Sequence, residues 1–268
     1  MSDSESQLID LAAACDKDPE KWARMAFDWG HGELADYSGP REWQTEAFEE
    51  IRDHLGNPKT RFQPLMLARA SGHGIGKSAF IGMVSNWALS TCDDCKVVVT
   101  ANTDTQLRTK TSPEIGKWAR LSITNHWFEP NAASIASRDK AHAKTWRADF
   151  VPWSEHNTEA FAGLHNKGKR IVLIFDEASA ISDKVWEVAE GALTDEDTEI
   201  IWIAFGNPTR NTGRFRECFR RFKHRWKARQ IDSRTVEGTN KEQISKWAAD
   251  YGEDSDFFKV RVRGMFPS

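Results

Sequence analysis

The residues from Ser71 to Ser78 combine three glycines, a lysine and a serine at spacings that suit phosphate binding. The octet reads Ser-Gly-His-Gly-Ile-Gly-Lys-Ser and lies between an apolar run at 65–68 and a helix-like segment at 79–84. Glycines allow backbone conformations that turn successive amide groups toward a phosphate, and the N-terminus of the following helix adds a partial positive charge. Lys77 would reach the β- and γ-phosphates of a nucleotide, and the Ser78 hydroxyl would bind Mg²⁺.

This context of strand, glycine-rich turn and helix predicts a P-loop. One departure is visible, because Ser71 occupies the position where the first glycine is usual. The alternative is an ordinary glycine-rich loop, which the placement of Lys77 and Ser78 disfavours. The positions expected to contact ATP are Ser71, Gly72, His73, Gly74, Ile75, Gly76, Lys77, Ser78 and Ala79.

A second chemical motif follows an apolar run that extends from Arg170 to Phe175. A continuous apolar run of this length is typical of a strand buried on both faces of a parallel sheet. Asp176 and Glu177 follow at its carboxyl end, which faces the crevice where open α/β sheets bind ligands. We expect Asp176 to hold Mg²⁺ through water, and Glu177 to orient and deprotonate the attacking water. The alternative is a buried strand followed by a helix-capping acid, which the presence of the P-loop disfavours.

The composition limits the class of protein. The chain has 268 residues, of which 39% are hydrophobic and 29% charged, which fits one large α/β domain with appendages. No stretch approaches the roughly 20 apolar residues of a membrane helix, and residues 1–5 are polar and acidic where a signal peptide would be positive. We therefore expect an intracellular protein without a membrane partner. Cys92 and Cys95 have C-x-x-C spacing but no second metal-binding pair, so we expect free thiols.

Charge is distributed unevenly, although the net charge is only −3. Residues 210–229 contain nine arginines and lysines and a single acid, Glu217. Such a block can contact phosphates, contact another subunit or simply face solvent, and the sequence leaves these three interpretations open. Our candidate DNA contacts are Arg214, Arg216, Arg220 and Arg221.

Apolar periodicity and turn residues predict an alternation of strands and helices. Strands are expected near 65–69, 96–100, 145–151, 170–175, 200–205 and 225–231. Helices are expected as a pair within 1–36, at 41–55, up to about 90, up to about 121, at 183–193 and at 241–262. This alternation indicates an α/β fold of the P-loop NTPase class, RecA-like and ASCE-type. A mostly parallel central sheet would be flanked by helices, with a small helical N-terminal or lid subdomain.

Four landmarks occur in order along the chain, at 40–44 (Pro-Arg-Glu-Trp-Gln), 71–78, 171–179 and 204–208 (Ala-Phe-Gly-Asn-Pro). This set resembles the ATPase domain of the large terminase subunit of tailed bacteriophages, the motor that packages DNA into procapsids. The resemblance covers the chain from about Arg41 to Ser268. The P-loop and the acidic pair are shared with many NTPases. The Gly-Asn-Pro at 206–208, with Gly-Arg-Phe soon after, is more particular to the family.

The resemblance implies roles for two further residues. Gln44 resembles the glutamine that reads adenine, and its amide can both donate and accept hydrogen bonds. Asn207 resembles the coupling residue that senses the γ-phosphate from the end of its strand. The alternatives that stay open are a solvated helix residue for Gln44 and a turn residue before proline for Asn207.

Two arginines of the family pattern are not at their usual positions here. Many terminases carry an arginine four residues before the P-loop lysine, where this chain has His73, and a histidine is at best partly charged at neutral pH. Either Arg69 takes over the positive charge or the loop needs less of it. A second arginine, often just before the acidic strand, is thought to reach into the site of the neighbouring subunit. Arg170 or Lys169 could serve, and we take Arg170 as the candidate.

The resemblance implies an Mg²⁺-dependent ATPase that drives double-stranded viral DNA into a procapsid. The expected partners are double-stranded DNA, the portal protein, the small terminase subunit and further copies of the chain in a ring, expected to be a pentamer. Such a protein would work in the host bacterial cytoplasm, transiently docked on the procapsid.

Full-length members of the family carry a nuclease domain built on clustered carboxylates. We therefore expect residues 1–60 to form a helical N-terminal or lid segment with the adenine-reading motif, and 61–235 to form the P-loop ATPase core. Residues 236–268 would be a helical lid or linker toward a nuclease domain that this chain lacks. On this interpretation the chain is the ATPase half, and DNA cleavage is not expected.

Two other functions are compatible with the same motifs. A superfamily helicase shares a Gln before the P-loop and the Asp-Glu pair, but it needs a second motor domain. A regulatory module that only binds nucleotide would share the P-loop, although the retention of Lys77, Ser78, Asp176 and Glu177 argues against it. Phosphate release separates the three, because a helicase fragment responds to single strands, a packaging motor to duplex, and a binding module releases none.

Overall fold

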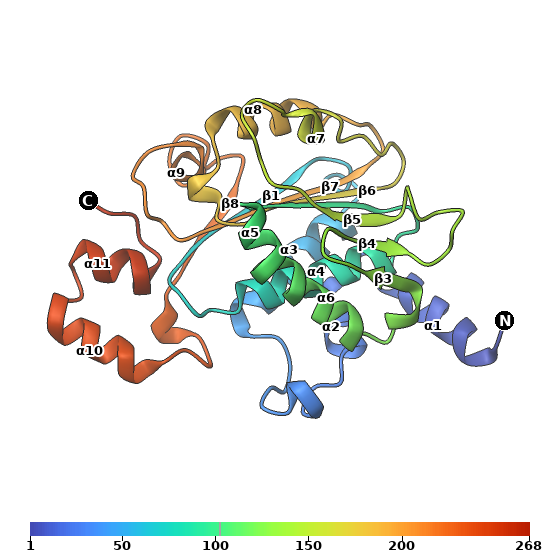
Figure 1. Ribbon diagram of the computed structural model, residues 1–268, viewed down its shortest axis with the longest axis horizontal. Coiled ribbons are helices and arrows are strands. Elements are labelled where there is room, and N and C mark those ends of the chain that lie inside the picture. Colours follow the sequence, from blue (N-terminus) through green and yellow to red (C-terminus); the bar gives the residue numbers. More distant parts are fainter. Residues whose placement is uncertain (102) are drawn as a thin grey trace.

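The computed structural model describes residues 1–101 and 103–268, and an eight-stranded sheet lies at its centre (Figure 1). The strands are β1 (Leu65–Ser71), β2 (Lys96–Thr100), β3 (Phe128–Pro130), β4 (Ser134–Ser137), β5 (Arg147–Phe150), β6 (Arg170–Phe175), β7 (Glu199–Gly206) and β8 (Lys227–Ile231). Their order is β3-β4-β5-β2-β6-β7-β1-β8. From β5 to β8 all neighbours are parallel, and β3 and β4 add an antiparallel pair at one edge. This pair was not predicted from the sequence.

Helices cover both faces of the sheet. The longer helices are α1 (Asp3–Ala14), α2 (Pro19–Ala26), α3 (Glu42–Gly56), α4 (Lys77–Ser90), α6 (Ser112–Leu121), α8 (Asp183–Ala192) and α10 (Lys241–Tyr251). Single turns are α5 (Asp104–Gln106), α7 (Glu159–Ala162), α9 (Arg214–Glu217) and α11 (Asp256–Phe258), with 3₁₀ turns at Gly32–Leu34, Asn125–Trp127, Ala178–Ala180 and Ser233–Thr235. Two π-helical turns span Leu107–Thr111 and Lys259–Arg263. Within the described residues, no helix is long and apolar enough to cross a membrane.

Alternating side chains of the central strands supply two separate cores. In β6, Leu173 and Phe175 belong to the apolar cluster that includes α8, whereas Val172 and Ile174 belong to the cluster that includes α3 and α4. Successive side chains of a strand point to opposite faces, so a strand that is apolar at every position must be covered on both. In Figure 1, α7 and α8 lie on one face and α2, α3, α4 and α6 on the other. The predicted α/β fold with a mostly parallel, doubly covered sheet is confirmed.

The N-terminal helices share the core of the sheet. Trp22 of α2 is fully buried, and its indole N–H donates to Asn86 Oδ1 of α4 at 3.0 Å. Trp87 of α4 donates to the carbonyl of Cys15 at 2.8 Å. Residues 1–26 therefore pack as part of the same body as the helices beneath the sheet.

The four cysteines of the chain have free thiols.

The strand order brings the two chemical motifs to one edge. Strand β7 lies between β1, which leads into the P-loop, and β6, which ends before Asp176. These three strands are parallel, with Ala70 opposite Gly206 and Phe175 opposite Ala204. Because the carboxyl ends of parallel strands meet at the same edge, the residues that follow them converge there.

Candidate nucleotide-binding site

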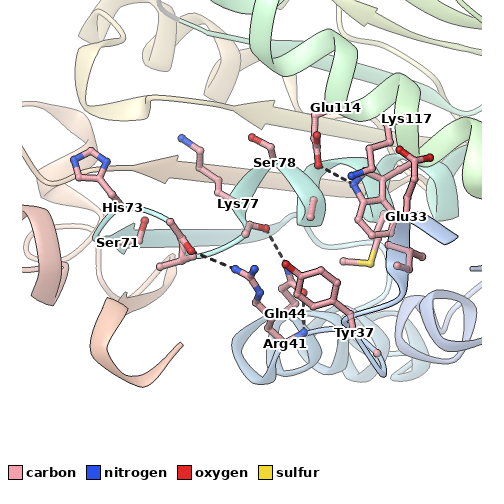
Figure 2. Close-up of a pocket in the computed structure, with 18 of the residues that line it drawn as sticks. Glu33, Tyr37, Arg41, Gln44, Ser71, His73, Lys77, Ser78, Glu114 and Lys117 are labelled. Atoms are coloured by element: carbon pink, nitrogen blue, oxygen red, sulfur yellow. Dashed lines mark hydrogen bonds between the residues drawn. The ribbon is translucent and has the colours of Figure 1, made fainter. Parts of the chain in front are cut away.

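A cavity of about 360 Å³ opens at this edge of the sheet. The whole octet from Ser71 to Ser78 lines it, together with Ala79, Gln44, Glu177 and Asn207. Figure 2 shows Lys77 and Ser78 on one side of the loop and Gln44 with Arg41 on the other. The structure thus gathers the predicted ATP-binding residues around one cavity.

The P-loop backbone has the geometry that its glycines permit. Gly74 and Gly76 have φ angles of +75° and +85°, in the left-handed region that favours glycine. Gly76 is the N-cap of α4, so Lys77 is the first residue of that helix. The amide groups at this helix N-terminus have no partner within the helix and are available to an anion.

Gln44 fixes the loop from the side of α3. Its side chain is 2% exposed, its Nε2 donates to the Gly76 carbonyl at 2.8 Å, and its Oε1 accepts from the Arg41 amide at 2.8 Å. The neighbouring Trp43 donates to the Ile75 carbonyl at 2.7 Å. The solvated-helix interpretation of Gln44 is therefore wrong, and its adenine-reading role stays a prediction. The motif at 40–44 holds the P-loop in place, which the sequence did not reveal.

Lys77 lies between the two acids that follow β6. Its Nζ is 2.9 Å from Asp176 Oδ1 and 2.7 Å from Glu177 Oε1. Burial acts to lower the pKa of Lys77, but the charges of Asp176 and Glu177 outweigh it, so the pKa lies above its ordinary value. Lys77 therefore stays protonated, and without nucleotide its charge is neutralised by the two carboxylates that ATP phosphates would have to replace.

Asp176 is held rigidly at the end of β6. Its Oδ2 accepts from the Thr111 hydroxyl at 3.0 Å, and its Oδ1 accepts from the Glu177 amide at 3.0 Å. Thr111 ends the π-helical turn 107–111, and such turns are frequent at functional sites. The Asp176 carboxylate and the Ser78 hydroxyl are hard oxygen donors of the kind that Mg²⁺ prefers, so these residues fit the predicted metal. Thr111 was not predicted, because nothing in its sequence context distinguishes it.

Glu177 has an unusual backbone conformation. Its φ and ψ angles are 53° and 49°, which place a non-glycine residue in the left-handed region. This conformation costs about 1–2 kcal/mol and persists only where the surroundings impose it. The side chain is 32% exposed, so it can reach both Lys77 and water. Strain at the expected catalytic base is consistent with a fixed orientation of its carboxylate.

Neither His73, which occupies the usual arginine position, nor Arg69, the candidate for taking over its charge, supplies a positive charge to the P-loop. Burial lowers the pKa of His73, and the charges of Arg261 and Lys77 lower it further against the opposing effect of Glu177, so His73 is neutral at pH 7. Arg69 is 2% exposed and pairs with Glu50, while its Nη1 donates to the Lys227 carbonyl at 2.7 Å. The prediction that Arg69 acts on phosphate is wrong, because its guanidinium is buried and binds Glu50 of α3 and the Lys227 carbonyl of β8.

Asn207 connects the P-loop with a distant segment. Its Nδ2 donates to the carbonyls of Ser71 and Val260, at 2.9 Å each. The amide of His73 donates to the Arg261 carbonyl at 2.9 Å. The π-helical turn 259–263 therefore packs directly against the start of the P-loop, and the coupling role of Asn207 stays a prediction that this contact supports.

Gly72→Ala should destabilise this contact and weaken nucleotide binding. A Cβ at Gly72 would come within 2.5 Å of the Val262 carbonyl and 2.6 Å of the Arg261 carbonyl, and would also clash with Ser233 Oγ. Overpacking of this kind costs about 1–3 kcal/mol. Thermal unfolding and titration with a fluorescent ATP analogue measure both effects. Gly191→Ala in α8, where no atom lies within 4 Å of the new Cβ, is the matched control and should leave both unchanged or raise stability slightly.

Arg170 does not lie near the nucleotide site. It is the first residue of β6, and at about 3.3 Å per residue it is about 20 Å from Asp176, at the opposite edge of the sheet. Its side chain is 1% exposed, its Nε donates to Glu199 Oε1 at 2.8 Å, and its guanidinium lies 4.2 Å from the centre of the Trp87 ring. The prediction that Arg170 reaches into a neighbouring subunit is wrong, because the side chain is buried and fully paired.

The four candidate DNA contacts are not equivalent. Arg214 pairs with Glu190 of α8, and its side chain is 13% exposed, so it is a structural residue and the prediction is wrong for it. Arg220 and Arg221 are exposed, and Arg216 is half-buried. The role of these three stays a prediction.

The fold and the site together define an α/β protein of the P-loop class in which one strand separates the P-loop strand from the acidic strand. No protein-family model matches the chain. It is 25% identical over 272 residues to the probable terminase large subunit of Enterobacteria phage P7, and the match covers 96% of this chain and 52% of that protein. The chain thus spans about half the length of this curated relative.

Solved terminase structures share the fold at low sequence identity. A large terminase from a thermophilic bacteriophage matches with a TM-score of 0.60 at 11% identity, over 85% of this chain and 53% of that chain. The HK97 bacteriophage large terminase matches with a TM-score of 0.55 at 11% identity, over 87% and 47%. A variant of the Thermus phage P74-26 large terminase ATPase domain matches with a TM-score of 0.52 at 15% identity, over 81% and 98%. The resemblance to the large terminase subunit of tailed bacteriophages is confirmed.

Proposed function

We propose that this chain hydrolyses ATP in an Mg²⁺-dependent reaction and that hydrolysis drives double-stranded viral DNA into a procapsid. The observation that carries the proposal is the position of Lys77 within hydrogen-bond distance of both Asp176 and Glu177, at the edge where the P-loop cavity opens. The relative in phage P7 is a probable terminase large subunit. A large terminase of a thermophilic bacteriophage has been solved with ADP and with ATP-gamma-S, which supports ATP as the substrate here.

The residues divide the chemistry between binding and proton transfer. Lys77 leaves the two carboxylates when ATP binds, and its ammonium group neutralises the β- and γ-phosphate oxygens. Amide groups of the P-loop and of the first turn of α4 donate to the same phosphates. Ser78 and Asp176 would hold Mg²⁺, which when bound would neutralise phosphate charge. A water attacks the γ-phosphorus, the bond from that phosphorus to the β–γ bridging oxygen breaks, and ADP leaves, while the Glu177 carboxylate orients the water and accepts its proton.

The assembly follows from the same proposal. We propose that the chain acts with the portal protein, the small terminase subunit and further copies of itself in a pentameric ring, in the host cytoplasm and transiently on the procapsid. The arginine that would complete a neighbouring site in such a ring is a residue other than Arg170. DNA cleavage is not part of the proposed activity.

Phosphate release tests the proposal directly. We expect Mg²⁺-dependent release that stops when EDTA removes the metal and that rises when duplex DNA is added. A response to single-stranded DNA alone would favour the helicase alternative. A chain that binds nucleotide but releases no phosphate under any of these conditions would be a binding module, and the proposed function would be wrong.

A further inference from the structure

A group of cations lies on the segment between β7 and β8. This segment leaves the nucleotide site at Asn207, forms α9 and returns through a series of turns to Lys227. In Figure 1, α9 lies beside the C-terminus and next to α8. Five of its cations form what we call the 210–223 surface, namely Arg210, Arg216, Arg220, Arg221 and Lys223.

These five cations form no ion pair with any acid in the part of the chain that the structure describes. Among the described residues, Glu190 pairs with Arg214 and Arg225, and Glu46 pairs with Arg229, but no carboxylate lies within ion-pair distance of the 210–223 surface. The single acid between 210 and 226 is Glu217. The folded chain therefore pairs Arg214, Arg225 and Arg229 with acids and leaves the cations of the 210–223 surface without an ion pair among the described residues.

Two of these guanidinium groups, those of Arg216 and Arg221, are held against aromatic rings. Arg216 donates to Asn211 Oδ1 at 2.9 Å and lies 4.5 Å from the centre of the Phe266 ring. Arg221 lies 5.0 Å from the centre of the Phe222 ring. Burial lowers the pKa of Arg216, and the like charge of Arg220 lowers it further against the opposing effect of Glu217. Stacking on rings fixes the guanidinium planes before a partner arrives, and an anionic partner would relieve the repulsion.

The chemistry of the surface fits a phosphate backbone better than an acidic protein. Four of the five cations are arginines, whose planar fork binds two phosphate oxygens at once. Protein interfaces usually have an apolar centre, but no large hydrophobic side chain between 207 and 226 is exposed, because the phenyl rings lie beneath the arginines. We propose that the 210–223 surface binds the phosphate backbone of duplex DNA. This inference rests on the proposed function and identifies the surface that would contact the DNA.

The position of the surface links it to the nucleotide site. Arg210 follows Asn207 by three residues, and Asn207 donates to Ser71 of the P-loop. On the other side, Phe266 packs against Phe215 and Phe219 of the surface segment, just beyond the turn 259–263 that contacts the P-loop. The start and the middle of the surface segment therefore lie beside elements that contact the P-loop backbone.

The salt dependence of DNA binding tests the inference. The full chain is titrated against a fluorescent duplex of about 30 base pairs at several concentrations between about 50 and 200 mM salt, where each neutralised phosphate contributes about −0.9 to the log–log slope. Arg220→Gln, Arg221→Gln and Lys223→Gln should each reduce the slope by roughly one unit, and the triple variant by roughly three. Lys140→Gln and Lys144→Gln, exposed cations before β5, are matched controls and should leave the slope unchanged.

Phosphate release measured on the same samples distinguishes failure of the DNA-binding inference from failure of the proposed function. If the triple variant keeps the parental slope while the parent binds duplex, the inference is wrong and the DNA site lies elsewhere. If the parent hydrolyses ATP but shows no salt-dependent binding of duplex, the inference is also wrong, and the surface would suit an acidic protein. If the parent neither hydrolyses ATP nor binds duplex, the proposed function fails as well.

Discussion

Glu177→Gln should reduce ATP hydrolysis by about 10²–10⁴-fold, because a positioned general base contributes a factor of this size. The substitution keeps the size of the side chain and removes the carboxylate that would accept the proton of water. Lys77 keeps its second partner, since Asp176 Oδ1 lies 2.9 Å from its Nζ. Nucleotide binding should persist, because the substitution leaves the P-loop and the Lys77 ammonium group in place. Phosphate release under saturating ATP measures the loss, and titration calorimetry measures the affinity.

Lys77→Ala is the informative contrast to this variant. It removes the cation that would neutralise the phosphates, so it should weaken ATP affinity itself rather than the chemical step alone. Parental hydrolysis by Glu177→Gln would show that another group is the base. Unchanged affinity in Lys77→Ala would contradict the P-loop assignment.

Arg170→Ala should lower the free energy of unfolding by about 3–5 kcal/mol, because it leaves Glu199 buried without its partner. Glu199 is 4% exposed and lies 2.8 Å from Arg170 Nε. Arg170 also donates to the Ala88 carbonyl and the Thr91 hydroxyl at the end of α4, so its loss affects two strands and a helix. For a chain of this size, the midpoint of thermal unfolding should fall by on the order of 10 °C.

Arg61→Ala provides a matched control for this effect. Arg61 pairs with the same Glu199 at 3.1 Å, but its side chain is 34% exposed, so its removal should cost about 1 kcal/mol or less. If Arg170→Ala kept the parental melting temperature while ATP hydrolysis per subunit fell, the structural role of Arg170 would be refuted and a role in a neighbouring site restored.

The sequence predicted the elements whose patterns are local and strong. Local sequence determines the conformation of the octet at 71–78 and of the continuous apolar run of β6. Because both follow or form parallel strands, the sequence also predicted that the P-loop and the acidic pair lie at the same edge of the sheet. Strands β3 and β4 were missed because runs of three or four residues have no measurable periodicity.

The side chains that were misassigned depend on partners far away in the sequence. Arg170 pairs with Glu199, Arg69 with Glu50 and Arg214 with Glu190. No local sequence pattern predicts such pairs. The contact of the turn 259–263 with the P-loop was invisible for another reason. It is made by backbone carbonyls, which every residue possesses.

The P-loop of this protein is enclosed by segments that are far apart along the chain, the motif at 40–44 and the turn at 259–263. Contacts between distant segments form late in folding, because the entropy of loop closure must be overcome first. The loop therefore reaches its native shape only once nearly the whole chain has folded. A nucleotide that binds only this shape stabilises the entire fold by mass action. Binding of the nucleotide therefore requires that the whole chain is folded.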